Sequence, residues 1–203
     1  MPLDHRRKVA IVGFCQTSRG YTPYEDKSFE IWGLNRGYIF MPRADRWFEM
    51  HGPHIHLSQD RRPGNHLVWL NQFPGPVYMH KAEPDIKTAV TYPLEEVASD
   101  IGQFLFSVDE AGKMQSAEDE PYLGSSIALE IALAIHERFE EIHLYGIDLN
   151  TESEYMWQKP GVEYLMGLAM GRGIKVVRAD NCPLLRSGIY GRGYLSPQGE
   201  QIS

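Results

Sequence analysis

The chain has 203 residues, of which 42% are hydrophobic and 23% are charged, and its formal net charge is -7. These values are those of an ordinary globular protein, and the length fits one domain over residues 1–203. The acidic balance argues against broad binding to a nucleic-acid backbone, and two cysteines, Cys15 and Cys182, are too few for a disulfide framework.

The sequence also predicts a protein without a membrane span. No stretch approaches the ~20 consecutive apolar residues of a transmembrane helix. The first residues pass directly into a short apolar run, which lacks the length of a signal peptide. Together with the low cysteine content, this indicates a cytoplasmic setting.

Short apolar runs in the first half of the chain predict buried strands at residues 8–14, 30–35, 46–51 and 77–80. The polar stretch 15–27 is expected to be a loop, and 65–72 a turn or two of helix. Further along, 94–106 favours a helix and 107–120 an acidic loop. We interpret 81–120 as a reduced lid or insertion.

The second half of the chain alternates between helix and strand. Residues 123–139 predict a helix buried against a sheet, with Ser125 and Ser126 as capping candidates, and 141–147 predict the next strand. A helix over 163–171 and a strand over 174–177 follow. This order is typical of parallel crossover units, so the expected fold is α/β and Rossmann-like, with an open, mainly parallel sheet and helices on both faces.

Ligands of open parallel sheets bind beyond the carboxyl ends of the strands, so the loops there are the first candidates for a site. After the first strand, Gly13 permits close backbone approach, and Gln16 and Thr17 supply hydrogen-bond donors. Their spacing matches neither a dinucleotide fingerprint nor a P-loop, which disfavours dehydrogenase and NTPase functions. An ordinary polar turn remains the alternative for this loop.

Three further positions follow the same logic. Ser125 and Ser126 open a helix whose free amides could hold a phosphate or carboxylate. Gly146 and Asp148 end the penultimate strand, where the carboxylate could accept from a ribose or sugar hydroxyl, and Asn35 ends another strand with an amide. The structural alternatives are a helix cap for the two serines, a loop-capping carboxylate for Asp148 and a turn residue for Asn35.

Histidines form a separate cluster in the segment HGPHIH, which holds His51, His54 and His56 directly after Glu49. Neutral imidazoles bind zinc and similar ions, so a divalent metal is one interpretation, although the glycine and proline of this loop favour no fixed geometry. The two other interpretations are a histidine that contacts the substrate or acts in catalysis, and a solvated loop.

In their order along the chain, GFCQTS, WGLN, SSIALEIALAI and EIHLYGIDL with Tyr155 downstream resemble single-domain bacterial sialyltransferases. The pairing of WGLN with RWFEMH also resembles uncharacterised phage-encoded proteins. The first set of motifs resembles, in addition, the related archaeal pterin pyrophosphokinase-like and motility accessory proteins. The likeness covers residues 8–185. It implies a Rossmann-like domain that holds a cytidine nucleotide sugar, with binding roles on Gly13, Gln16, Thr17, Asn35, Ser125, Ser126, Gly146 and Asp148.

The resemblance also predicts catalytic positions and one departure. Tyr155 is expected near the leaving group, where its hydroxyl could donate to a departing phosphate. Where the family has its general-base histidine, this chain offers Gln158, which cannot accept a proton at neutral pH. A base would then come from Glu154, Glu163 or a histidine such as His51.

Three functions follow from these observations. The first is a glycosyltransferase-like enzyme that binds a nucleotide sugar and transfers its glycosyl group. The second is a protein that binds a nucleotide-derived small molecule without catalysis. The third is pyrophosphate transfer to a pterin-like alcohol, which would need magnesium held by carboxylates such as Asp148 and Glu152. No other cofactor is implied, and the sequence leaves a homo-oligomer open.

Overall fold

A computed structural model describes residues 7–52, 65–102, 106–108, 110–116, 122–150, 154–186, 194–195 and 201–202. Its main sheet contains seven strands: β1 (Lys8–Val12), β2 (Phe29–Leu34), β3 (Arg46–Phe48), β4 (Val77–Met79), β5 (Ala89–Thr91), β8 (Glu141–Tyr145) and β9 (Lys175–Arg178). Two antiparallel hairpins stand apart from this sheet, β6 (Phe106–Val108) with β7 (Met114–Ser116), and β10 (Tyr194–Leu195) with β11 (Gln201–Ile202). The helices are α1 (Gln16–Arg19), α3 (His66–Gln72), α4 (Leu94–Ile101), α5 (Ser126–His136) and α6 (Glu154–Gly171), with a 3-10 turn η1 (Gly37–Ile39).

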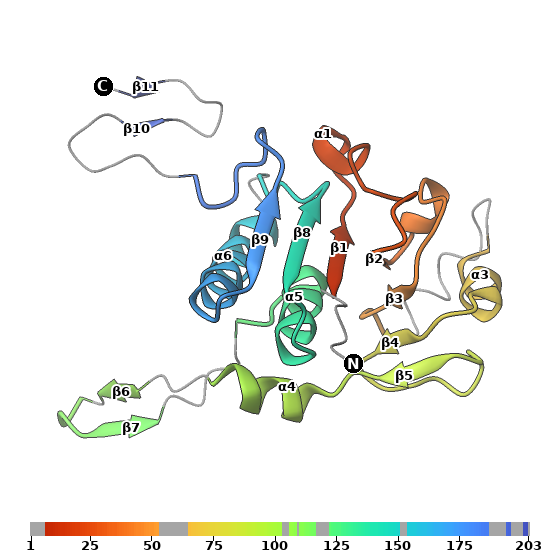
Figure 1. Cartoon of the computed structure of the whole chain (residues 1–203). Coiled ribbons are helices and arrows are strands. Elements are labelled where there is room, and N and C mark those ends of the chain that lie inside the picture. The colour runs from red at the N-terminus through yellow and green to blue at the C-terminus, as the bar shows by residue number, and fades with distance from the viewer. Residues whose placement is uncertain are drawn as a thin grey trace, which may run out of the picture.

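Every strand of the main sheet runs parallel to its neighbours, in the order β5-β4-β3-β2-β1-β8-β9. From β1 the chain moves outward to β5 on one side, and it then returns to place β8 and β9 on the other side of β1 (Figure 1). The order therefore reverses between β1 and β8, and such a reversal is where ligands of open α/β sheets bind. In Figure 1, α1 lies beyond the arrowhead of β1, which marks the carboxyl edge of the sheet.

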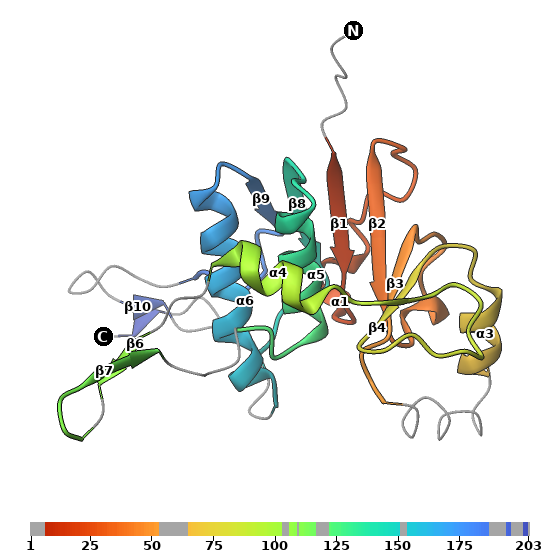
Figure 2. The ribbon, with the colours of Figure 1, turned by 90° about the horizontal axis from the view of Figure 1, so that it is seen from below.

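Alternating side chains of the strands face two different layers. Val9 and Ile11 of β1 belong to the large core cluster that includes α4, α5 and α6, whereas Ala10 and Val12 contact the opposite layer. Trp47 packs on that second side with Leu70 of α3 and with Phe73, which directly follows α3. Figure 2 shows α4, α5 and α6 gathered together and α3 apart from them, beyond β3 and β4. The predicted fold class is confirmed, and the main sheet is entirely parallel.

An ionic cluster closes the amino edge of the sheet. Arg46 donates to Glu30 at 2.8 Å and to Glu137 at 2.6 Å, and its guanidinium stacks over Trp32. Burial alone would raise the pKa of Glu137, but hydrogen bonds from Arg46 and Arg7 hold it below the ordinary value. These ion pairs join β2 and β3 to the end of α5, far from the carboxyl edge.

Several elements differ from the sequence-based expectations. β5 was not expected, because a three-residue edge strand carries little hydrophobic signal. The helix expected over 94–106 ends at Ile101, because Gly102 follows it in the left-handed conformation (φ +66°) that ends many helices. The short helix α1 lies within the expected loop 15–27. β6 and β7 pair as a hairpin that begins at Phe106, the last residue of the expected helix, and continues into the expected loop 107–120.

α6 begins much earlier than the expected helix over 163–171. Pro160 and Gly161, which normally mark a helix boundary, lie inside it. Gly161 is required by packing, because a Cβ there would come within 2.6 Å of the carbonyl oxygen of Tyr122. The close approach of α6 to the chain before α5 therefore explains the glycine.

The stretch 81–120 is partly integral to the domain. β5 pairs with β4, and Val97 and Ile101 of α4 lie in the main core. Residues 89–101 thus belong to the sheet and its helical layer. The prediction of a lid or insertion over 81–120 stays a prediction.

Candidate functional site

The strand register brings three predicted loops to one edge. Val12 of β1 lies level with Gly33 of β2 and with Tyr145 of β8, so Gly13, Asn35 and Gly146 follow at about the same height. They surround a cavity of about 600 Å³. The cavity is lined by Gly13, Phe14, Cys15, Leu34, Asn35, Arg36, His51, Ser125, Ser126, Ile127, Gly146, Ile147, Asp148, Leu149, Asn150 and Gln158.

Two glycines let the loops after β1 and β8 cross closely beside the cavity. A Cβ on Gly13 would lie 2.4 Å from the carbonyl oxygen of Gly146, which is too close for any side chain. Gly146 has φ +65°, a conformation that costs glycine little, and its N–H donates to the buried Ser18 hydroxyl at 2.7 Å. The amide of Cys15 in turn donates to the Gly146 carbonyl at 2.9 Å. The loops therefore form a tight backbone wall.

Asp148 stands just beyond this wall and is only 8% exposed. The Thr17 hydroxyl lies 2.8 and 3.0 Å from its two carboxylate oxygens. Thr17 does not itself line the cavity and contributes by orienting Asp148. Burial is the main reason that the pKa of the neighbouring Cys15 thiol is raised, and the Asp148 carboxylate raises it further. The raised pKa keeps the Cys15 thiol neutral at neutral pH.

Asn35 occupies the end of β2 with φ +49°, in the left-handed region that asparagine tolerates better than most residues. Its backbone is fixed on both sides, because its N–H donates to Phe48 and its carbonyl accepts from the indole of Trp47 at 3.1 Å. Its side-chain oxygen Oδ1 is buried and has no hydrogen-bond partner among the described residues. A buried acceptor of this kind is normally satisfied, and because Asn35 lines the cavity, a ligand donor could supply the missing hydrogen bond.

The amino end of α5 forms another wall. Ser125 is the N-cap, and its side chain accepts from the amide of Ala128 at 3.1 Å. The first amides of a helix have no partner within it, and here Ser126 and Ile127 line the cavity. This end of the helix carries partial positive charge, which favours an anionic ligand group.

His51 reaches the cavity from the end of β3 and is held by a buried carboxylate. Its Nδ1 lies 2.8 Å from Glu49, which is 1% exposed, and His66 Nε2 lies 2.6 Å from the other oxygen of the same carboxylate. Burial alone would raise the pKa of Glu49, but hydrogen bonds from His51 and His66 lower it to about 2. An ionised carboxylate only accepts hydrogen bonds, so His51 donates from Nδ1 and Nε2 is its basic nitrogen.

The remaining predicted residues are distributed as follows. Gln158, on α6, lines the cavity. Gln16 is exposed on α1 and does not line it. Glu163 lies elsewhere on α6, where its carboxylate accepts from the amide of Leu185 at 2.8 Å, which is a structural role. Tyr155 belongs to the first turn of α6, but its side chain lies outside the described part of the chain, as do Glu152, His54 and His56.

Sequence reasoning missed Arg36, which follows Asn35 directly and lines the cavity. Its place after a strand was the signal that could have found it. The pairing of Glu49 with His66 was also missed, because the two residues are 17 positions apart and meet only in the folded chain.

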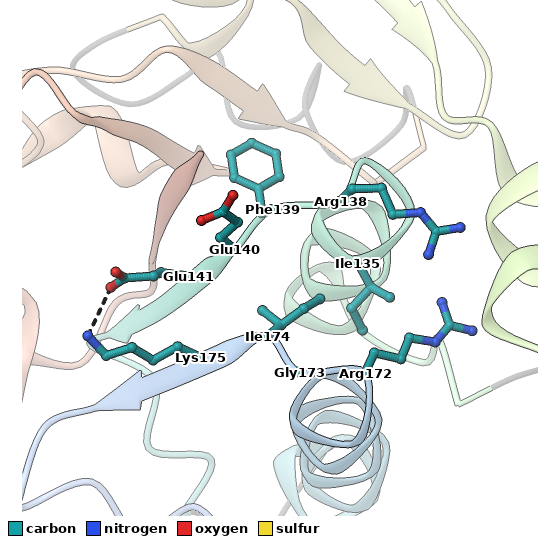
Figure 3. Close-up of a pocket in the computed structure, with 9 residues that line it drawn as sticks. All are labelled: Ile135, Arg138, Phe139, Glu140, Glu141, Arg172, Gly173, Ile174 and Lys175. Atoms are coloured by element: carbon teal, nitrogen blue, oxygen red, sulfur yellow. Dashed lines mark hydrogen bonds and ion pairs between the residues drawn. The ribbon is translucent and has the colours of Figure 1, made fainter. Parts of the chain in front are cut away.

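The described residues line two further cavities, one beside the first cavity and one at the opposite edge of the sheet. One of about 400 Å³ adjoins the first, because His51 lines both, and it continues along Gly52, Met79, His80, Lys81, Ala82, Glu83 and Pro84. The other, of about 420 Å³, lies at the amino edge between the ends of α5 and α6 (Figure 3). There the cations are already engaged, since Arg138 and Arg172 bind Asp100 and Lys175 binds Glu141.

Within the described ranges, no group of three histidine, cysteine or acidic side chains is arranged to hold a metal ion. The same ranges contain no helix of the length and apolarity needed to cross a membrane.

Comparison with known proteins gives structural relatives alone. No protein-family model matches the chain, and no curated protein matches its sequence. The fold is similar to the sialyltransferase CstII from Campylobacter jejuni in complex with the substrate analogue CMP-3FNeuAc. The TM-score is 0.52 and the identity 16%, over 87% of this chain and 81% of that one. A structure of the sialyltransferase CST-II with a trisaccharide acceptor and CMP gives a TM-score of 0.51 at 14% identity, over 87% and 82% of the two chains. At these identities the likeness establishes the fold.

Proposed function

We propose that this protein is a glycosyltransferase that binds a cytidine nucleotide sugar in the cavity at the carboxyl edge of β1, β2 and β8. The fold is shared with sialyltransferases whose structures contain CMP or a CMP-sugar analogue. The cavity lies where the strand order reverses, which is the usual ligand position of such sheets. Its volume of about 600 Å³ is that of a small-molecule site.

The polar groups of the cavity suit the parts of such a donor. Asp148, oriented by Thr17, is placed to accept from a ribose hydroxyl, and Asn35 Oδ1 needs a donor that an exocyclic amine or a hydroxyl would supply. Ser125 and Ser126 at the start of α5 suit an anionic group. Gly13 and Gly146 let the two loops cross closely, and this crossing builds the wall against which the donor would lie.

The observation that carries the proposal is the position of His51 between the two adjoining cavities, with Nδ1 held by ionised Glu49. With the donor in the larger cavity, the smaller one receives the acceptor. The acceptor hydroxyl passes its proton to His51 Nε2 as its oxygen attacks the anomeric carbon of the donor. The bond between that carbon and the phosphate oxygen breaks, and CMP leaves with the electron pair. Glu49 stabilises the imidazolium that forms.

This assignment gives His51 the task that Gln158 cannot perform. A glutamine side chain takes up no proton at neutral pH, so Gln158 serves only as a hydrogen-bonding group of the cavity wall. Tyr155 remains a proposed donor to the leaving phosphate. Glu163 is not proposed as a base, because its carboxylate is engaged by Leu185 outside the cavity.

The test combines binding with turnover. Nucleotides and nucleotide sugars are screened by thermal shift, and CMP release from a CMP-linked sialic acid is measured with water or added saccharides as acceptors. We expect CMP and its sugar conjugate to raise the melting temperature, and His51→Gln to abolish release while binding remains. His136→Gln is the matched control, since His136 binds Asp100 outside the cavity. No shift with any nucleotide or nucleotide sugar would contradict the donor site.

A second candidate is a protein that binds the nucleotide but performs no transfer, and Gln158 favours it, because the resemblance expects a histidine there. The same experiment separates the two. Binding of CMP without any release from the conjugate, in wild type as in His51→Gln, would support the second candidate and exclude the first.

A further inference from the structure

Arg36 is a partly buried cation in the cavity wall. It follows Asn35 at the end of β2, and its backbone is the N-cap position of η1. Its Nε atom is buried and has no hydrogen-bond partner within the described part of the chain. Among the cavity-lining residues of the described chain, Arg36 is the sole lysine or arginine.

Arg36 differs in this respect from the other partly buried arginines of the described ranges. The other partly buried arginines there all donate to carboxylates or main-chain carbonyls: Arg7 to Glu137, Arg19 to Phe14, Arg43 to Asp45, Arg46 to Glu30 and Arg178 to Cys182. A buried guanidinium nitrogen without a hydrogen-bond partner costs free energy, and an anion bound beside the guanidinium would offset that cost. The free-energy cost at Arg36 is therefore best explained by a ligand.

The surroundings of Arg36 specify an anion. Asp148 is the acidic side chain among the described lining residues, and Thr17 already donates to it. Across the same cavity, the first amides of α5 also favour negative charge. A planar guanidinium matches a phosphate or carboxylate with two parallel hydrogen bonds.

We propose that Arg36 is a specificity-determining residue that binds the anionic group of the donor. That group is the phosphate joined to the ribose or a carboxylate on the transferred sugar. The proposal rests on the function proposed above and adds the requirement that the donor carry such a group beside the arginine. Asn35 and Arg36 then act together, because Asn35 accepts a hydrogen bond from a neutral polar group of the ligand and Arg36 binds its anionic group.

The test compares Arg36→Gln with wild type by calorimetric titration of three probes. Cytidine has neither anion, CMP has the phosphate, and a CMP-linked sialic acid has the phosphate and a carboxylate. We expect Arg36→Gln to weaken the binding of an anionic probe by ~10- to 100-fold and to leave cytidine binding unchanged. Arg36→Lys should fall between wild type and Arg36→Gln, because it keeps the charge but not the paired hydrogen bonds.

Arg186→Gln is the matched control, because Arg186 is exposed and does not line the cavity. Weakening of CMP binding by Arg36→Gln assigns the arginine to the phosphate, and weakening of the sialic acid conjugate alone assigns it to the carboxylate. Equal binding of all probes by Arg36→Gln and wild type overturns the inference while the donor site stands. If wild type binds neither CMP nor the conjugate, the proposed function fails together with it. Urea unfolding of each variant verifies that the fold is intact.

Discussion

Replacing Glu49 by glutamine removes the charge that holds His51 and His66 while it keeps the volume of the side chain. Glu49 is 1% exposed, and its pKa is lowered from 4.5 to about 2. At 1.36 kcal/mol per pKa unit, this difference corresponds to about 3 kcal/mol of stability at neutral pH. Because the pKa of this acid is depressed in the folded state, its contribution is present above pH ~4.5 and is lost as the pH falls toward 2.

Urea unfolding of wild type and Glu49→Gln between pH 3 and pH 8 measures this contribution. We expect the variant to be less stable by about 3 kcal/mol at pH 7. The difference in stability between wild type and variant should narrow by up to about 1.4 kcal/mol per pH unit once the pH falls below 4.5, the pKa of this carboxyl in the unfolded chain. A gap of equal size at pH 3 and pH 7, or no gap at either, would refute the account of Glu49 as an ionised carboxylate shared by two histidines.

Three further changes test other parts of the structure. Glu130 is fully buried and has no hydrogen-bond partner among the described residues, and burial raises its pKa. Relative to Glu130→Gln, wild type should therefore lose up to about 1.4 kcal/mol of stability per pH unit above pH ~4.5. Urea unfolding measures both proteins, and stability curves that stay parallel with pH would exclude a raised pKa of Glu130. Gly13→Ala places a Cβ against the Gly146 carbonyl and should cost about 1–3 kcal/mol in thermal unfolding. Gly20→Ala, where a Cβ meets nothing within 4 Å, should cost almost nothing, and equal effects would argue against the close crossing. His51→Asn should slow CMP release by ~10²- to 10⁴-fold and leave the Kd for CMP nearly unchanged; an unchanged rate would exclude His51 as the base.

The parts of the site that sequence reasoning located are those fixed by local chain direction. Gly13, Asn35 and Gly146 each follow a strand that reads as buried, and Ser125 precedes a strongly apolar helix. In a parallel sheet, the carboxyl ends of strands must meet at one edge, so these positions could be brought together without knowing the strand order.

The parts that sequence reasoning could not locate depend on packing between distant segments. Glu49 meets His66 only because α3 packs beneath the end of β3, and no local pattern specifies that contact. Glu163 was a reasonable base by composition alone, but it does not line the cavity, and its carboxylate accepts from the amide of Leu185. The start of α6 was hidden because Pro160 and Gly161 normally indicate a helix end, whereas here tight packing against Tyr122 retains the glycine.

A crystal structure of the protein with CMP tests the central claim most directly. The account predicts nucleotide density in the cavity between Gly13, Asn35, the start of α5 and Asp148, with a ribose hydroxyl near the Asp148 carboxylate. Density in the cavity between the ends of α5 and α6 instead, or an empty carboxyl-edge cavity at saturating CMP, would contradict it.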